Sequence, residues 1–345
     1  MSEEPTHLRK SLRLFLSVDI AGSTAFKSLQ PEKVQPWLPT LYRFFREFPV
    51  RLANAYDEGA CPRLWKTLGD EMVFVAEISD HREVAKHICR FRDTVGGYRE
   101  VIKEATRRLD LKGSAWLAGF PVGNTVIRLP QGVQEGDETE DYIGPSVDCG
   151  FRLSKHSTPH KLVLSIETAY LLQASGAPGG AEKPEVYLER GEALKGVLNG
   201  RPYPCLWVNV PYRDNEKFHK LEGELMDAPH EHKEGKIRDY CRFFIEEYGT
   251  PLFLPFIEGD SDFGKLPPGY DEKMSAVRKL WDEGCRPHDK NPGNGGEEPS
   301  VEKMEQKLVA LGSTKSKTSA QKSKKAGASK TSPPKKKYPT KRARN

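Results

Sequence analysis

The chain has 345 residues, of which 37% are hydrophobic and 30% are charged. A chain of this length can bury a large core without a disulfide framework. It contains no run of about 18 apolar residues, so we expect no membrane span. The six cysteines form no C-x-x-C pair and therefore indicate reduced thiols rather than a zinc ribbon. The start, Met1-Ser2-Glu3-Glu4-Pro5, lacks the regions of a secretory signal, which favours a cytoplasmic location.

The positive charge is concentrated at the C-terminal end. The formal net charge is +5, but residues 314–345 hold 12 Lys or Arg and no acidic residue. Without them, 42 basic residues face 49 acidic ones, and the net charge is −7. Residues 286–345 are predicted to form a disordered Lys-rich tail, because this composition cannot bury enough apolar surface. Such a tail would contact nucleic acid nonspecifically, and it has no aromatic groove that would make binding nucleic acid the main function.

Strand and helix patterns alternate from Ser11 onward. The expected strands are 12–18, 63–68, 71–75, 114–118, 161–164, 186–189 and 205–210. The expected helices are 82–108, 235–248 and 274–281, with others that pass through Trp37 to Phe48 and begin at Pro145 and Ser165. Residues 129–140, rich in acidic residues and glycine, indicate an exposed loop. Because hairpin signals recur, we predict an α+β domain with a mixed or antiparallel sheet.

Two aspartates fall at strand ends. Asp19 follows the first strand, and Asp70 lies at the tip of a hairpin whose turn is Gly69-Asp70. Divalent cations such as Mg²⁺ prefer carboxylate and phosphate oxygens. The loop Gly22-Ser23-Thr24 offers amides and hydroxyls to a polyphosphate. Either aspartate alone would be an ordinary turn residue, but together with this loop they indicate a site for a nucleoside triphosphate.

Four segments in this order resemble the motifs of class III nucleotide cyclases. They are Phe15-Leu16-Ser17-Val18-Asp19-Ile20-Ala21-Gly22-Ser23-Thr24, Lys66-Thr67-Leu68-Gly69-Asp70, Asp141-Tyr142-Ile143-Gly144-Pro145-Ser146-Val147-Asp148-Cys149-Gly150-Phe151-Arg152 and Leu194-Lys195-Gly196. The resemblance covers residues 11–213 and implies a ferredoxin-like catalytic domain. It also implies a head-to-tail homodimer in which each site takes residues from both subunits. Residues 214–285 are predicted to form a helical accessory region.

The resemblance assigns a role to each matching residue. Asp19 and Asp70 match the metal-binding aspartates, and Ile20 would add its backbone carbonyl, so that each site would hold two Mn²⁺ or Mg²⁺ ions. Arg152 matches the arginine that stabilises charge on the α-phosphate, and Lys195 matches the lysine that holds the triphosphate. Without the resemblance, Arg152 could simply pair with Asp148 one helical turn away, and Lys195 could be an exposed loop lysine.

Lys66 and Asp141 match the pair that reads adenine in adenylate cyclases. A lysine donor beside a carboxylate acceptor suits adenine, cytosine and uracil alike, so hydrogen bonding alone leaves the base open. Asp148 stands where the family has an asparagine that orients the ribose, and Pro145 is a second departure. A carboxylate at Asp148 could bind sugar hydroxyls or orient Arg152.

These departures most resemble the bacterial pyrimidine cyclases of the Pycsar antiphage systems. That resemblance implies synthesis of cyclic UMP, or less favoured cyclic CMP, and activation of a separate effector that kills the infected cell. Two alternatives stay open: an adenylate cyclase, and a degenerate cyclase fold that only binds nucleotide. His230 and His232 could ligate a metal, but with no further cluster beside them a solvated loop is the better interpretation.

Overall fold

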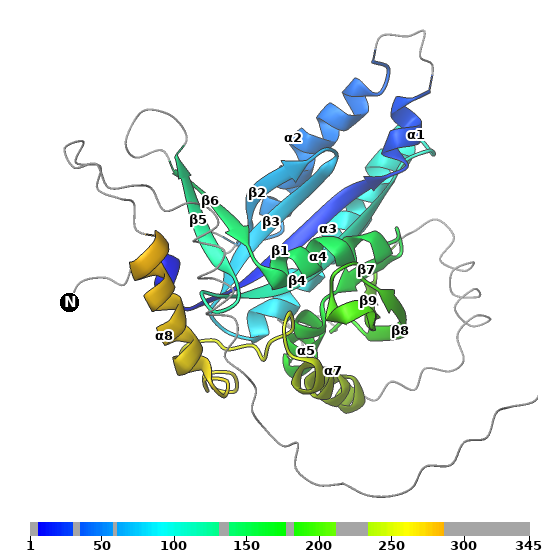
Figure 1. Ribbon diagram of the computed structural model, residues 1–345. Helices are drawn as coiled ribbons and strands as arrows, with labels where there is room; N and C mark the ends of the chain where they lie inside the picture. The colour runs from blue at the N-terminus through cyan, green and yellow to red at the C-terminus, as the bar shows by residue number, and fades with distance from the viewer. Residues whose placement is uncertain are drawn as a thin grey trace, which may run out of the picture. The chain divides into compact units, whose positions relative to one another are not determined.

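The computed structural model describes residues 6–29, 35–57, 61–130, 138–176, 183–211 and 234–285, and a seven-stranded sheet runs through them (Figure 1). The strand order is β2-β3-β1-β4-β7-β9-β8, in which β4 and β7 are parallel and the other neighbours are antiparallel. The strands are β1 Ser11–Ala21, β2 Arg63–Leu68, β3 Glu71–Ile78, β4 Asp110–Phe120, β7 Lys161–Leu164, β8 Val186–Ala193 and β9 Pro202–Asn209. A separate hairpin consists of β5 Thr125–Pro130 and β6 Glu138–Ile143.

The strands β1 to β4 have the ferredoxin-like arrangement. The chain passes from β1 through α2 to β2, turns directly into β3, and returns through α3 to β4. The helices are α1 Ser23–Lys27, α2 Leu38–Asn54, α3 Arg82–Ala105, α4 Pro145–Leu153, α5 Ile166–Ala174, α7 Glu234–Tyr248 and α8 Tyr270–Leu280. This topology confirms the predicted α+β fold with a mostly antiparallel sheet and helices. The predicted tail, together with His230 and His232, lies outside the described residues.

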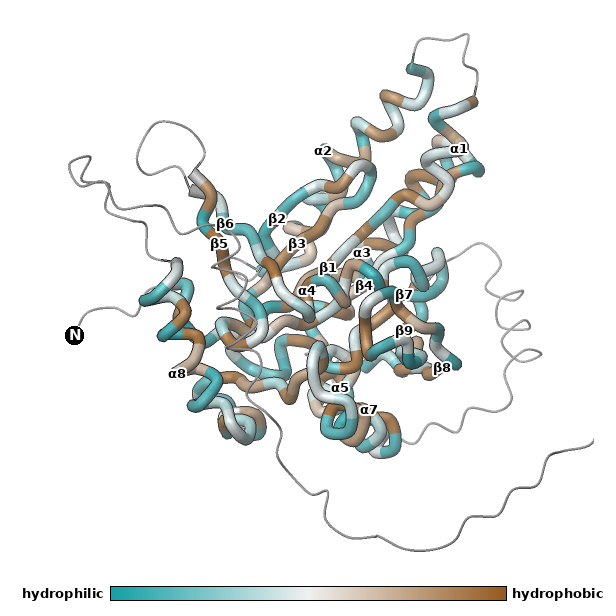
Figure 2. Tube along the Cα trace, viewed as in Figure 1, coloured by the Kyte–Doolittle hydropathy of each residue, from teal (hydrophilic) through white to brown (hydrophobic). Residues whose placement is uncertain are grey.

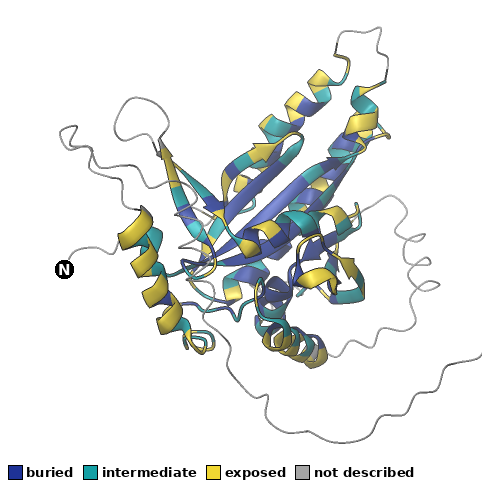
Figure 3. Ribbon diagram, in the orientation of Figure 1, coloured by how far each residue is buried: buried dark blue, intermediate teal, exposed yellow. Residues whose placement is uncertain are grey.

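The central strand β1 is buried on both faces (Figure 3). Its even-numbered residues, such as Leu14 and Leu16, join the main core with α2 and α3. On the opposite face, Phe15 packs with Trp65, Trp116 and other residues in a second cluster. Burial on two faces explains why residues 12–18 show a nearly continuous apolar run instead of strict alternation.

Helix α4 packs against the second cluster through a glycine. A Cβ built on Gly150 would lie 2.2 Å from ring atoms of Trp116, far inside van der Waals contact. Trp116 is fully buried, so its ring cannot move away cheaply. The missing side chain is therefore what lets α4 approach β4 closely.

Replacing this glycine is expected to destabilise the fold. Gly150→Ala should lower the free energy of unfolding by about 1–3 kcal/mol, because it overpacks a filled core. Gly97→Ala is the matched control, since Gly97 is exposed on α3 and its Cβ would meet no atom within 4 Å. Denaturant unfolding measures both, and equal stability of the two variants would contradict the close packing of α4.

The prediction of a loop over residues 129–140 was wrong at its two ends. Leu129 lies in β5, and Glu140 lies in β6, where it pairs with Arg128. The charge of Glu140 is accommodated because Arg13 and Arg63 approach its carboxylate to 3.1 and 2.7 Å. Acidic composition alone gave no sign of these long-range partners. Other bounds also differ: α3 ends at Ala105, and β1 and β4 are longer than predicted.

The C-terminal extension, residues 234–285, packs on the rest of the described chain. α7 lies against α5 and buries Ile237, Cys241 and Ile245, while most of its exposed residues are charged, so hydrophilic and hydrophobic positions alternate along it (Figure 2). The predicted helix 235–248 corresponds to α7. The predicted helix 274–281 corresponds to α8, which begins four residues before the predicted start. The buried residues are four apart, which is the spacing of one face of a helix.

A buried carboxyl group lies under this extension and should make stability depend on pH. Burial raises the pKa of Glu167 to about 7, and hydrogen bonds from the backbone at Glu167 itself and at Phe253 offset only part of that rise. Because the folded pKa is raised, the stability it contributes is fully present below its ordinary pKa of 4.5 and is lost as the pH rises through about 7.

We therefore expect Glu167→Gln to be more stable than the parent protein by roughly 1–3 kcal/mol at alkaline pH and to differ little at acidic pH. Glu258→Gln is the control, because Glu258 is exposed in the same extension. Unfolding free energies of the three proteins measured across this pH range test the prediction. Parallel curves for parent and Glu167→Gln would contradict it.

Candidate active site

Three carboxylates gather where β1 meets the β2–β3 hairpin. Asp19, near the end of β1, is paired across the sheet with Glu71, the first residue of β3. Asp70 precedes Glu71 in the two-residue turn, where Gly69 has a φ of 66°. The turn was predicted correctly from Gly69-Asp70. Paired residues of neighbouring strands share a face, so Asp19 and Glu71 point to the face that carries the second cluster.

Two lysines partly neutralise these carboxylates. The Nζ atom of Lys112 lies 3.2 Å from Asp19, and the Nζ atom of Lys27 lies 3.2 Å from Asp70. Burial raises the pKa of Asp19; Lys112 opposes this rise, and the nearby charge of Asp70 adds to it. Burial also raises the pKa of Glu71, to which Ser17 donates a hydrogen bond. The cluster thus holds more negative charge than its lysines compensate.

This donor set fits a hard divalent cation. Carboxylate oxygens are the preferred ligands of Mg²⁺ and Mn²⁺, and a divalent ion would relieve the repulsion between Asp19, Asp70 and Glu71. Ile20 follows Asp19 in β1, and because its side chain is a hydrocarbon, it could contribute only its backbone carbonyl.

The predicted polyphosphate loop forms the start of a short helix. Gly22 has a φ of 86°, a backbone conformation that favours glycine, and it precedes α1. Gly22 and Thr24 are exposed, whereas Ser23 is only 4% exposed. Of the three residues, Gly22 and Thr24 can therefore reach a ligand most directly.

The structure brings Lys66 and Asp141 together. Lys66 lies in β2 and Asp141 in β6, and their charged groups are 2.6 Å apart. Both side chains are about one-third exposed, at 29% and 30%. The Lys66 ammonium also lies 4.0 Å from the centre of the Trp65 ring, which restrains the lysine. A cation and a carboxylate are thus held side by side at the surface, on the face shared with Asp19.

Asp148 and Arg152 line a pocket of about 620 Å³ beside α4. They are one helical turn apart, as predicted, but they form no ion pair among the described residues. The pocket continues along residues 196–199, immediately after the exposed Lys195. Hence α4 and the β8–β9 connection bring Arg152 and the Leu194-Lys195-Gly196 segment to one place.

The metal-site aspartates do not line the Arg152 pocket. Neither Asp19 nor Asp70 is among the described residues that line it. Exposed apolar side chains lie beside the site residues, with Leu68 45% and Ile143 48% exposed.

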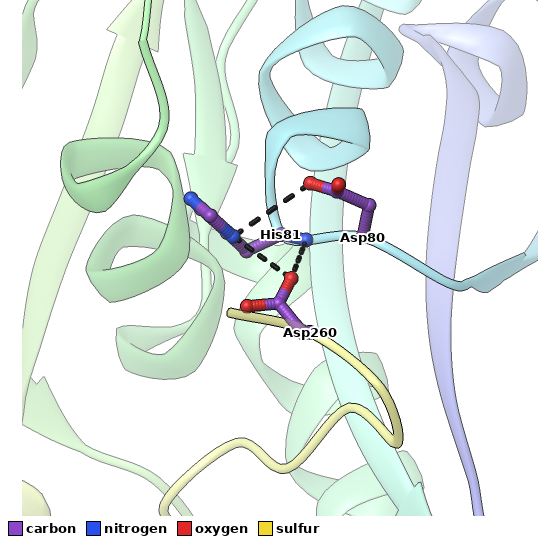
Figure 4. Close-up of side chains that lie close together, drawn as sticks. All are labelled: Asp80, His81 and Asp260. Carbon is purple, nitrogen blue, oxygen red and sulfur yellow. Dashed lines mark hydrogen bonds and ion pairs between the residues drawn. The ribbon is translucent and has the colours of Figure 1, made fainter. Parts of the chain in front are cut away.

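A different cluster could hold a cation by geometry. Asp80, His81 and Asp260 each place a ligand atom within 4.8 Å of the others, the single such group found in the described part of the chain (Figure 4). However, one oxygen of Asp260 accepts hydrogen bonds at 2.8 Å from the His81 backbone nitrogen and lies 2.8 Å from its Nδ1. The other oxygen accepts from the amides of Asp262 and Phe263. These bonds tie the extension to the start of α3 and account for the cluster without a metal.

Sequence reasoning missed several residues around the site. Lys112 pairs with Asp19 across β1 and β4, and Lys27 reaches Asp70 from α1. The strand predicted over residues 114–118 does not include Lys112, and the register of β1 with β4 that places Lys112 opposite Asp19 carries no sequence signal. No sequence signal marked Tyr248 or Arg201, which also line the Arg152 pocket.

Comparisons with known proteins give only distant structural likeness. The adenylyl cyclase CyaB from P. aeruginosa is 15% identical, with a TM-score of 0.46 over 60% of this chain and 97% of that chain. The guanylyl cyclase Cya2 is 15% identical, with a TM-score of 0.43 over 61% and 98%. The catalytic core of a rhodopsin-guanylyl cyclase with converted specificity, in complex with ATPalphaS, is 16% identical, with a TM-score of 0.43 over 59% and 98%. At these values the likeness carries no argument about activity. The searches for a family model and for a curated protein both returned no match.

Among the described residues, none of the helices combines the length and hydrophobicity that crossing a membrane requires.

Proposed function

We propose that this protein is a nucleotidyl cyclase, which converts a nucleoside triphosphate to its 3′,5′-cyclic monophosphate. The 3′-oxygen of the ribose attacks the α-phosphorus, the bond from that phosphorus to the bridging oxygen breaks, and pyrophosphate leaves. The 3′-hydroxyl proton passes to solvent. The observation that carries the proposal is the contact of Lys66 with Asp141 on the sheet face that also presents Asp19.

The carboxylates at the end of β1 are the proposed metal site. Asp19, Asp70 and the carbonyl of Ile20 would hold two Mn²⁺ or Mg²⁺ ions, which when bound favour the alkoxide form of the attacking oxygen and neutralise phosphate charge. Lys27 and Lys112, now paired with these aspartates, can turn to phosphate oxygens.

Other residues would bind the reacting groups. Arg152, which has no ion-pair partner among the described residues, would donate to the α-phosphate as negative charge develops there. Lys195 and the amides around Gly22, Ser23 and Thr24 would bind the other phosphates. Asp148 would accept hydrogen bonds from ribose hydroxyls, because an ionised carboxylate only accepts.

Within this proposal, UTP is the favoured substrate, CTP less so. Lys66 and Asp141 present one donor and one acceptor to the base edge, a pattern that uracil, cytosine and adenine can all satisfy. The preference for UTP rests on the sequence resemblance to the pyrimidine cyclases of antiphage systems. An adenylate cyclase is the main alternative for the base. A role in antiphage defence, through a separate effector activated by the cyclic nucleotide in the cytoplasm, rests on the same resemblance.

The proposed active unit is a homodimer with two shared sites. Asp19 and Asp70 of one chain would face Arg152, Lys66 and Asp141 of the other. The separation of the aspartates from the Arg152 pocket within one chain supports this arrangement, as do the exposed apolar side chains beside both groups. Residues 11–213 would form the catalytic domain and 214–285 an accessory region.

Incubation of the purified full-length protein with each labelled triphosphate and Mn²⁺ tests the proposal. Cyclic UMP and pyrophosphate are the expected products. Conversion of ATP alone would replace the pyrimidine assignment with an adenylate cyclase. Absence of any cyclic product, with a metal titration carried out, would overturn the proposed activity.

A second candidate is a cyclase-like protein that binds nucleotide without converting it. The observation in its favour is Asp148, whose negative charge lies in the same pocket as Arg152 and would oppose phosphate. Tight binding of a triphosphate without turnover would support it. In that case Asp148→Asn should tighten triphosphate binding, because the opposing charge is removed, and still give no turnover, whereas in an active cyclase it should change kcat.

A further inference from the structure

The C-terminal extension forms one wall of the pocket that contains Asp148 and Arg152. Glu247 and Tyr248, at the end of α7, line this pocket, and so does Pro251. The carbonyl of Pro251 also accepts a hydrogen bond at 3.0 Å from Oγ of Ser146, the second residue of α4. The extension is therefore bonded directly to the helix that carries Arg152.

Arg201 brings a second guanidinium to this pocket. It directly precedes β9, and its guanidinium carbon lies 5.0 Å from the centre of the Tyr248 ring. Stacking on an aromatic ring restrains a guanidinium but leaves its N–H edge free to donate hydrogen bonds. No ion pair of Arg201 occurs within the described ranges.

The pocket keeps opposite charges apart. Arg152 and Arg201 line it together with Asp148 and Glu247, and no ion pair joins any of these four in the described structure. A ligand that carries both phosphates and sugar hydroxyls would satisfy all four, since guanidinium groups donate to phosphate and carboxylates accept from hydroxyls. The volume of about 620 Å³ is in the range of pockets for small-molecule ligands.

We propose that Arg201 is a further substrate-binding residue, which donates to phosphate oxygens of the nucleotide and is positioned by Tyr248 of the C-terminal extension. This inference rests on the proposed function. It gives the accessory region a direct part in the site, because Tyr248 holds one of the two guanidinium groups that face the phosphates. Pyrophosphate, which shares those phosphates, should bind to the same pair.

Titration calorimetry of the full-length protein with inorganic pyrophosphate tests the inference without requiring turnover. Arg201→Ala is expected to weaken binding by about 10-fold or more, because a charge-assisted hydrogen bond is lost. Tyr248→Leu, which removes the stacking and keeps Arg201, should weaken it by about 2- to 5-fold. Arg238→Ala is the matched control, since Arg238 is exposed on the same helix, and it should bind like the parent.

The failure of this inference and that of the proposed function can be told apart. Parent-like pyrophosphate binding by a folded Arg201→Ala protein would overturn the role of Arg201, as would a parent protein that does not bind pyrophosphate at all. Cyclase turnover by the parent would leave the proposed function standing in both cases. If Arg201→Ala fails to fold, Arg201→Lys replaces it in the same calorimetry. Lysine keeps the charge but lacks the planar guanidinium, so it should still weaken pyrophosphate binding relative to the parent protein, and parent-like binding would overturn the inference.

Discussion

A mixture of two inactive variants, Asp70→Ala and Arg152→Ala, is expected to recover cyclase activity. Each change alone should lower kcat by about 10²- to 10³-fold or more, because it removes a metal ligand or a transition-state cation from both sites. In a mixed dimer, one site would combine the intact Asp70 of one chain with the intact Arg152 of the other. If equal amounts pair at random, half of the dimers are mixed, and each mixed dimer has one intact site of its two. The mixture should therefore recover about a quarter of the parent activity.

The matched control mixes Asp70→Ala with Asp19→Ala. Both aspartates lie at the same end of the same sheet face, so no mixed dimer of these variants could assemble a complete metal site. The assay measures cyclic nucleotide after subunit exchange, with dimer mixing verified by differently tagged chains. No recovery from verified Asp70→Ala and Arg152→Ala dimers would contradict shared sites. Equal recovery in the control mixture would contradict the assignment of both aspartates to one half.

Sequence signals between neighbouring residues made two parts of the site predictable. Gly69-Asp70 between two apolar runs defines a two-residue turn, and this fixed Asp70 at the hairpin tip. Pro145 at the start of a helix placed Asp148 and Arg152 one turn apart on α4. In each case the determining interactions join residues close together in the sequence.

Contacts between distant parts of the chain were not predictable in this way. The sequence resemblance alone predicted that Lys66 and Asp141 act as a pair, since their spacing along the chain carries no signal. Their contact depends on how the β5–β6 hairpin meets β2. That hairpin was itself missed, because Glu140 and its neighbours look like a solvated loop until Arg13 and Arg63 are placed beside them. Acidic residues fit in a strand when cationic partners lie beside them, and distant partners of this kind are not visible in the local sequence pattern.

The pocket wall formed by the C-terminal extension also could not be predicted from the sequence. Helix α7 was predicted from its aromatic and apolar positions, but such positions indicate only that the helix packs, not on what. Its contact with α5 and the position of Tyr248 beside Arg201 follow from tertiary packing. Sequence patterns therefore located the elements, whereas the pocket between α4 and the extension required the structure.

The other large effect is expected at the base-recognition pair. Lys66→Ala should lower kcat/KM for the preferred triphosphate by about 10- to 100-fold, because it removes a charged donor worth about 1.5–3 kcal/mol. It should also narrow the difference in kcat/KM between the triphosphates, since Asp141 alone would accept a hydrogen bond from any base that offers an amine or imino proton. A purely structural Lys66 would lower activity toward all four substrates equally.

Lys161→Ala supplies the comparison that separates base recognition from the loss of a surface ion pair. Lys161 pairs with Glu189 as Lys66 pairs with Asp141, its side chain is also 29% exposed, and it stacks near Trp207 as Lys66 does near Trp65. Because neither Lys161 nor Glu189 lines the Arg152 pocket, the loss of this second pair should cost at most about 1 kcal/mol of stability and leave the order of kcat/KM values unchanged. An equal change in substrate order for Lys66→Ala and Lys161→Ala would show that the Lys66–Asp141 pair does not read the base.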